Sequence, residues 1–161
     1  MGVINPIGSS DPTTDLGPWG MSGNGATLIT PTLNQLHVVK VWVPGLVTLT
    51  GIAYTVWTGS ATTHVLVSLY SNTGTLLAQS ASTTVSAAQG AQKVPFTAPR
   101  ATSPGAYFIG IMFDATVASL SAGDSTLDAS NTQTQGAFTL PATLTPPSVS
   151  DFNPHPAVAT Y

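Results

Sequence analysis

Runs of apolar and β-branched residues predict a succession of strands between residues 36 and 115. Residues 38–43 form one such run, which ends at the turn Pro44-Gly45, and residues 46–57 form a second run of the same character. Gly51 interrupts the second run, which predicts a β-bulge or a close approach of another part of the backbone.

The clearest local pattern predicts a β-hairpin over residues 64–80. Val65, Val67 and Leu69 alternate with more polar positions, so they share one face of a strand. Asn72 and Gly74 follow, and they supply the turn chemistry, because Gly74 can adopt the left-handed backbone that often closes such a loop.

Residues 106–113 are apolar at odd and at even positions, which predicts a central strand covered on both sides. Residues 92–97 predict a shorter strand, with Pro95 at a sheet edge or a bulge. Residues 137–140 are a candidate for the last strand. No segment has the apolar spacing of an amphipathic helix. Short strands separated by turn residues predict an all-β fold, an antiparallel β-sandwich.

The chain divides into an extended N-terminal arm (1–30), a sandwich domain (31–145) and a Pro-rich extended C-terminal arm (146–161). Each arm carries apolar side chains that could cover its own domain or dock on a neighbouring molecule, and both alternatives stay open. The candidate partner contacts are Pro18, Trp19, Met21, Phe152, His155 and Tyr161.

Charged residues make up only 6% of the chain, against about 25% in an average domain. Lys40, Lys93 and Arg100 are the only basic residues, all the acids are Asp, and the net charge is −3. So few like charges favour association between copies. Three scattered cations argue against a nucleic-acid partner, and no apolar run is long enough for a membrane span. No signal peptide is expected, and without cysteine there is no disulfide framework.

The sequence offers little chemistry for an enzyme. Six Asp and three His occur outside any recognisable catalytic motif, so we expect no catalytic site, no cofactor and no metal. Asp124 and Asp128 could offer oxygens to calcium, but their spacing is more typical of turn residues. Trp42, Tyr54 and Trp57 could form a platform for a sugar ring, although core or interface packing is the commoner use of such residues.

Four stretches carry a resemblance to a known module: residues 49–53, 67–80, 94–99 and 104–110. Together, residues 52–113 resemble a jelly-roll module of virion proteins in tailed bacteriophages. This resemblance implies a jelly-roll-like sandwich found in capsid decoration (cement) proteins, tail spikes and fibres, commonly as trimers. It transfers no catalytic residue.

On this basis we expect a capsid decoration protein that binds the major capsid protein as a homotrimer. It would be made in the host cytoplasm and located on the virion capsid surface. The alternative is a carbohydrate- or receptor-binding jelly-roll module of a tail fibre or spike.

Overall fold

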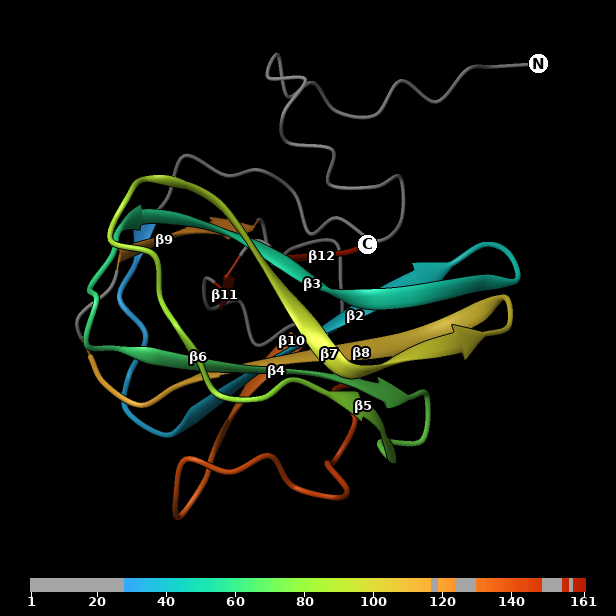
Figure 1. The fold of residues 1–161 in the computed structure, drawn as a ribbon. Helices are drawn as coiled ribbons and strands as arrows, with labels where there is room; N and C mark the ends of the chain where they lie inside the picture. Colours follow the sequence, from blue (N-terminus) through green and yellow to red (C-terminus); the bar gives the residue numbers. More distant parts are fainter. Residues whose placement is uncertain (1–27, 117–118, 124–129, 149–154, 157) are drawn as a thin grey trace.

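The computed structural model describes residues 28–116, 119–123, 130–148, 155–156 and 158–161 as two antiparallel sheets that face each other (Figure 1). The first sheet contains β1 (Leu28–Ile29), β3 (Val47–Thr58), β7 (Gly90–Thr102), β9 (Ser119–Gly123), β11 (His155–Pro156) and β12 (Val158–Thr160). The second contains β2 (Gln35–Val43), β4 (His64–Ser71), β5 (Leu76–Gln79), β6 (Thr83–Thr84), β8 (Gly105–Phe113) and β10 (Ser130–Thr134).

The order of the strands is that of a jelly roll. In the first sheet the order is β1-β9-β3-β7, and in the second sheet it is β2-β8-β4-β5. Apart from the β4–β5 hairpin, each successive strand of this set of eight crosses to the opposite sheet, which gives the two interlocked Greek keys of this fold. The predicted all-β sandwich is therefore confirmed.

The core between the sheets follows from the period-two alternation of side chains along a strand. Val39, Val41 and Val43 of β2 point inward and are buried, whereas Lys40 and Trp42 between them are exposed. Their partners come from both sheets, so one apolar cluster joins them: Leu49, Ile52, Tyr54, Val56, Val65, Val67, Leu69, Val94, Phe96, Ile109, Ile111, Phe113, Leu120 and Val158.

The central strand β8 is covered on both sides, as its sequence predicts. Its inner side chains join the main core, and Phe108 and Met112 on its outer side join a second cluster with Leu36, Val38 and Tyr70. The cover is the chain segment after β10, which lies across this outer face with Phe138, Leu140 and Leu144 against it. The prediction of a strand over residues 137–140 is wrong, because residues 137–139 form bends and Phe138 and Leu140 pack on the sheet from outside.

The 64–80 hairpin is confirmed, and its turn also holds the covering segment. Gly74 has φ +85°, and its carbonyl accepts a hydrogen bond from the Leu144 N–H at 2.9 Å. Leu76 N–H donates to the Ala142 carbonyl at 3.0 Å, and the Tyr70 hydroxyl donates to the Pro141 carbonyl at 3.1 Å. The protein's own chain thus covers the part of this outer face around Leu36, Tyr70 and Met112.

Gly51 is both a bulge and a close approach, as predicted. The register of β3 against β7 shifts between Leu49 and Gly51, and Pro95 lies opposite Gly51. The prediction that Pro95 lies at an edge or bulge is thus also confirmed. The strand around Pro95 is longer than expected, because β7 runs past Pro99 to Thr102 as the outer neighbour of β3.

Part of the predicted C-terminal arm belongs to the sandwich. β12 pairs with β3 over Ile52–Tyr54, and β11 pairs with β9. Val158 and Thr160 are buried, so of the two alternatives left open for this end, the structure places residues 158–161 on their own domain. The sandwich also begins before residue 31, because β1 pairs with β9.

Candidate interface

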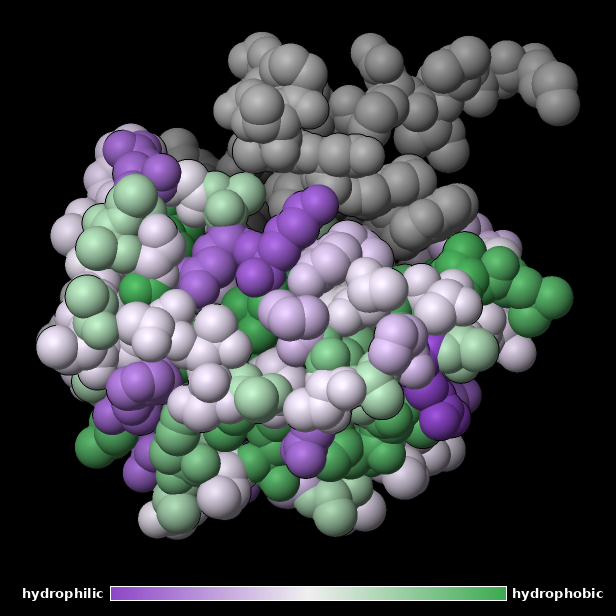
Figure 2. Space-filling model, viewed as in Figure 1, coloured by the Kyte–Doolittle hydropathy of each residue, from purple (hydrophilic) through white to green (hydrophobic). Residues whose placement is uncertain are grey.

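The β2–β3 turn presents the most exposed large apolar side chain of the described residues. Leu46, directly after Pro44-Gly45, is 82% exposed, and Trp42 near the end of β2 is 63% exposed. We call this turn with its two side chains the β2–β3 tip. Figure 2 shows hydrophobic residues gathered at the corresponding corner of the molecule, on the right of the view.

Basic residues flank the β2–β3 tip. Lys40 is exposed and shares the outer face of β2 with Trp42, roughly 6.6 Å along the strand. Arg100 is exposed close to the end of β7, on the strand that pairs with the start of β3. The one acidic residue among those described is Asp114, which follows β8 at the opposite end of the sandwich. The tip is therefore apolar with positive charge beside it.

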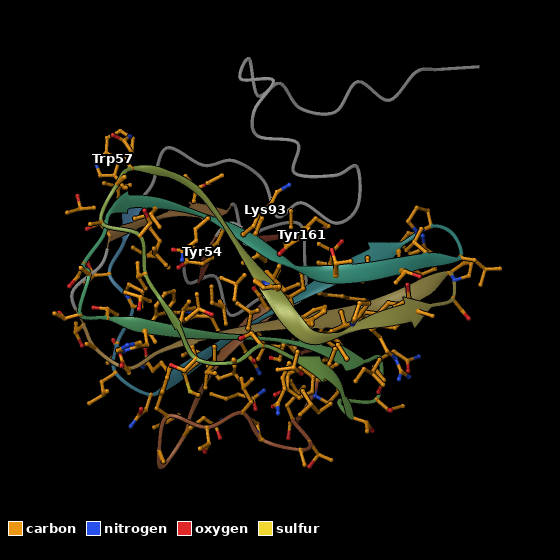
Figure 3. The ribbon with its side chains drawn as sticks, viewed as in Figure 1. Tyr54, Trp57, Lys93 and Tyr161 are labelled. Atoms are coloured by element: carbon orange, nitrogen blue, oxygen red, sulfur yellow. The ribbon has the colours of Figure 1, made fainter. Side chains whose placement is uncertain are left out.

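A second group of exposed apolar side chains lies at that opposite end. Trp57, near the end of β3, is 50% exposed, and in Figure 3 its ring points away from the sheets. Leu28 of β1 and Leu33, in the connection from β1 to β2, are also exposed there. All five exposed large apolar side chains of the described residues thus lie near the two ends of the sandwich.

The three aromatic residues of the candidate sugar platform are not brought together. Trp42 lies on β2 of the second sheet, near the turn that leads into β3, and Trp57 lies on β3 of the first sheet, near its far end. β3 has 12 residues and is roughly 35–40 Å long, so the two rings are far apart. Tyr54 is only 1% exposed and lies between the sheets (Figure 3). A buried ring offers no face to a sugar, so no platform of three aromatics exists.

Tyr54 has a structural role. Its hydroxyl donates to Gln92 Oε1 at 2.6 Å, and burial raises the pKa of the phenol well above its usual range. The same amide oxygen accepts from the Ser86 N–H at 2.8 Å, and Gln92 Nε2 donates to the Thr84 carbonyl at 2.8 Å. Gln92 thereby fixes the loop between β6 and β7 to the core.

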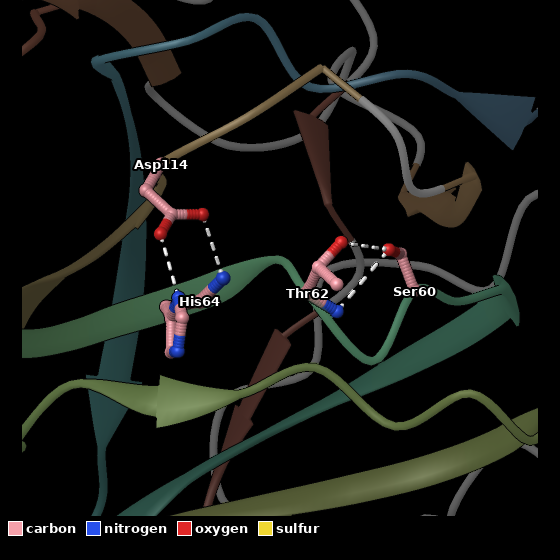
Figure 4. A network of polar contacts seen from close by, with 4 residues as sticks. All are labelled: Ser60, Thr62, His64 and Asp114. Carbon is pink, nitrogen blue, oxygen red and sulfur yellow. Dashed lines mark hydrogen bonds and ion pairs between the residues drawn. The ribbon is translucent and has the colours of Figure 1, made fainter.

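One ion pair is present among the described residues, between His64 at the start of β4 and Asp114 (Figure 4). His64 Nδ1 lies 2.7 Å from Asp114 Oδ2, and the His64 backbone N–H donates to Asp114 Oδ1 at 2.6 Å. The Asp114 N–H donates in turn to the His64 carbonyl at 3.1 Å. The carboxylate therefore closes a clasp between β4 and β8.

The clasp does not form a catalytic triad with the nearby hydroxyls. Ser60 and Thr62 hydrogen-bond each other at 3.0 Å, and within the described chain neither is hydrogen-bonded to the imidazole of His64. A triad requires a nucleophile within hydrogen-bond reach of its base.

A metal centre finds no support in the part of the chain that the structure describes. In that part, no three His, Cys, Asp or Glu side chains lie close enough together to hold a metal ion. Asp124 and Asp128, the calcium candidates, lie outside the described residues. His37 is buried on β2.

The six predicted partner contacts divide between described and undescribed parts. Pro18, Trp19, Met21 and Phe152 lie outside the described residues. His155 lies in β11, where it pairs with Gly123. Tyr161 is half-buried, and Lys93 Nζ lies 5.0 Å from its ring centroid (Figure 3).

The sequence prediction missed Leu46, Leu28 and Leu33 as contact candidates. Leu46 was readable in principle, because a large apolar residue directly after Pro-Gly stands in a turn, where burial is least expected. The described part of the chain contains no helix long and apolar enough to cross a membrane. No protein-family model matches the chain, and no match is found among curated proteins or among solved structures.

Proposed function

We propose that this chain is a non-enzymatic structural protein of a tailed-phage virion, a capsid decoration protein that binds and stabilises the capsid surface as an oligomer. The observation that carries the proposal is the exposure of large apolar side chains at both ends of a charge-poor domain, Trp42 and Leu46 at one end and Trp57 at the other. Exposed apolar side chains that gather at one place are typical of protein–protein contact sites. The assignment to a phage virion depends on the resemblance of residues 52–113.

The jelly-roll strand order agrees with this assignment at the level of fold. Viral capsid and lectin domains both use the fold. Fold alone does not specify function, which depends on the chemistry of the surface that the fold presents. The His64–Asp114 clasp and the Tyr54–Gln92 contact use polar groups to hold strands and loops, as expected for a scaffold.

A decoration protein of this kind would stabilise a shell through contact area. Each buried square ångström of apolar surface contributes about 25 cal/mol, before the entropic cost of binding is subtracted. A single copy gains little, but many copies that each bridge neighbouring capsid subunits add their contributions. The low charge suits this role, since there is little like-charge repulsion between adjacent copies.

The alternative is a carbohydrate- or receptor-binding module. Trp42 and Trp57 are exposed singly, at opposite ends of the sandwich, and each could stack on one sugar ring. The buried position of Tyr54 weakens the platform on which this alternative was based.

The proposal is tested by co-sedimentation of the full chain with empty capsid shells of the phage that encodes it. We expect saturable binding, and we expect shells with the protein bound to disassemble at a higher temperature than bare shells do. The control protein is the full chain heat-denatured before mixing. No binding to shells, together with binding of a defined glycan that is lost in Trp57→Ala, would overturn the proposal in favour of the alternative.

A further inference from the structure

We propose that the β2–β3 tip of one copy binds the acidic segment, residues 11–21, of a neighbouring copy. The inference rests on the proposed assembly role, since it names the occupant of an interface which that role requires. The proposed contact joins copies of this chain to one another, and other surfaces of the molecule would bind the capsid.

The size of the tip favours an extended segment over a second folded face. Trp42 and Leu46 together offer on the order of 300 Å² of apolar surface, judged from their exposed fractions and the size of their side chains. A stable contact between two globular faces buries about 800 Å² on each partner. A narrow apolar site is better matched by a short peptide that places one or two large side chains on it.

Charge complementarity points to residues 11–21. Lys40 and Arg100 lie beside the apolar side chains of the tip. Asp114, the one acidic residue in the part of the chain that the structure describes, pairs with His64 at the far end of the sandwich. The acidic segment contains Asp11 and Asp15 and has no basic residue.

The same segment also supplies large apolar side chains, namely Leu16, Trp19 and Met21. No other stretch of eleven residues in the sequence combines two carboxylates with three such side chains. Trp is one of the three residue types enriched among the residues that dominate the binding energy at contact sites.

Chain length favours a neighbouring tip over the tip of the same molecule. Ile29 of β1 is level with Val56 through Leu120 of β9, and β1 runs parallel to β3, so the chain comes to Leu28 from the side of the tip and joins the sheet near the end opposite it. From Val56 to the tip is roughly 30–35 Å along β3. Residues 19 to 28 span at most about 30 Å when fully extended. Trp19 therefore reaches its own tip only with residues 19 to 28 fully extended, whereas the tip of a neighbour can approach it directly.

Such a contact joins two different surfaces, one from each copy. A contact of this type closes into a ring when the rotation between copies allows it. A ring of three copies, the oligomer expected from the resemblance, would use three identical tip–segment contacts.

The test uses sedimentation equilibrium on three full-length variants. The tip variant carries Trp42→Ser and Leu46→Ser, and the segment variant carries Leu16→Ser and Trp19→Ser. The matched control is Trp57→Ser, which removes an exposed Trp at the far end. We expect the tip and segment variants to associate at least about tenfold more weakly than the parent chain, and the control to be unchanged. A circular-dichroism melt confirms that each variant is folded.

Mixing the two variants gives the decisive result. The segment variant keeps an intact tip, and the tip variant keeps an intact segment, so an equimolar mixture can form one productive contact and should stop at a 1:1 heterodimer. A mixture that stays monomeric, or a tip variant that associates like the parent chain, would overturn the inference. Capsid co-sedimentation of the tip variant separates the two proposals, because the decoration role stands if single copies still bind shells.

Discussion

At the scale of single residues, Gly51 shows how tightly the first sheet is built around the C-terminal residue. A Cβ at this position would collide with the Val94 carbonyl and lie 2.6 Å from the Tyr161 hydroxyl and 2.8 Å from Pro95 Cα. Two of these three neighbours are backbone atoms, which cannot move without disturbing β7.

We therefore expect Gly51→Ala to lower the free energy of unfolding by about 2 kcal/mol or more, as overpacking does. The measurement is urea unfolding followed by circular dichroism. Gly45→Ala is the matched control, because a Cβ there meets nothing within 4 Å. Equal stability of the two variants would show that β3 and β7 are not packed as described.

Gln92 and Tyr54 are hydrogen-bonded, and we expect substitutions of the two residues to lower the free energy of unfolding by different amounts. Tyr54→Phe removes one hydroxyl and leaves the Gln92 amide with its other partners, so we expect a loss of about 1 kcal/mol. Gln92→Met leaves the buried Tyr54 hydroxyl and the Ser86 N–H without their acceptor, and should cost about 2–3 kcal/mol. Thermal melts of both variants check the order, and a reversed order would contradict this account of the loop.

From the burial of the Tyr70 phenol we expect the protein to lose stability at alkaline pH. Burial raises the pKa of its phenol to about 12, although a hydrogen bond with Ser68 acts in the opposite direction. The phenols of an unfolded chain lose their protons near pH 10. Stability that is fully present below pH 10 should therefore decline as the pH rises from about 10 to about 12.

The measurement is the free energy of unfolding in urea from pH 8 to pH 12. Tyr70→Phe cannot ionise at this position, so its stability should decline less steeply over that window, although it starts lower because the bond to Pro141 is lost. Identical slopes for the variant and the parent chain would rule out Tyr70 as a source of the decline.

At the scale of elements, β12 is a structural strand, although its sequence is typical of a tail. It fills the edge of β3 that β9 leaves free, and Tyr161 continues the pairing through Gly51, whose carbonyl accepts the Tyr161 N–H at 3.2 Å. Thr50 and Gly51 donate back to the Tyr161 carbonyl. A truncation at this end would therefore unfold part of the sandwich as well as remove a contact candidate.

We expect deletion of residues 158–161 to lower the melting temperature by about 10 °C, because Val158 leaves the core and the edge of β3 loses its partner. Tyr161→Ala keeps the strand and should cost only a few degrees. If the deletion melts like the parent chain, β12 contributes nothing to the fold.

The elements that the sequence predicted are those whose signal is local. The hairpin at 64–80 and the strand at 105–113 have turn chemistry or continuous apolar runs, so their positions could be read directly. β9 and β10 are rich in Ser, Thr and other small or polar residues and give no period-two signal. They exist because β3 and β2 present edges on which they pair, which is information carried by other parts of the chain.

The candidate site divides in the same way. The sequence indicates Trp42 and Trp57 as aromatic residues near strand ends, and both are exposed. Tyr54 could not be told apart from them, since its burial depends on the bulge at Gly51 and on packing against Phe113, whose ring centroid lies 5.9 Å away. The exposure of Leu28 and Leu33 depends on where β1 joins the sheet, which residue type does not reveal.

At the scale of the whole molecule, the two ends of the sandwich differ in chemistry. The β2–β3 tip combines apolar side chains with Lys40 and Arg100, and the other end carries Trp57, Leu28 and Leu33 with the His64–Asp114 clasp. The segment that carries Phe138 and Leu144 covers part of the outer face of the second sheet. Because the five exposed large apolar side chains of the described residues lie near these two ends, the molecule is suited to contacts made through its ends.

The measurement that tests this account most directly is the mass of the full chain in solution, by light scattering over a wide range of concentration. The account predicts an oligomer, and the proposed ring predicts three times the chain mass of 16.4 kDa. A mass of one chain at every concentration would contradict the central claim that this domain is built to assemble with its own copies.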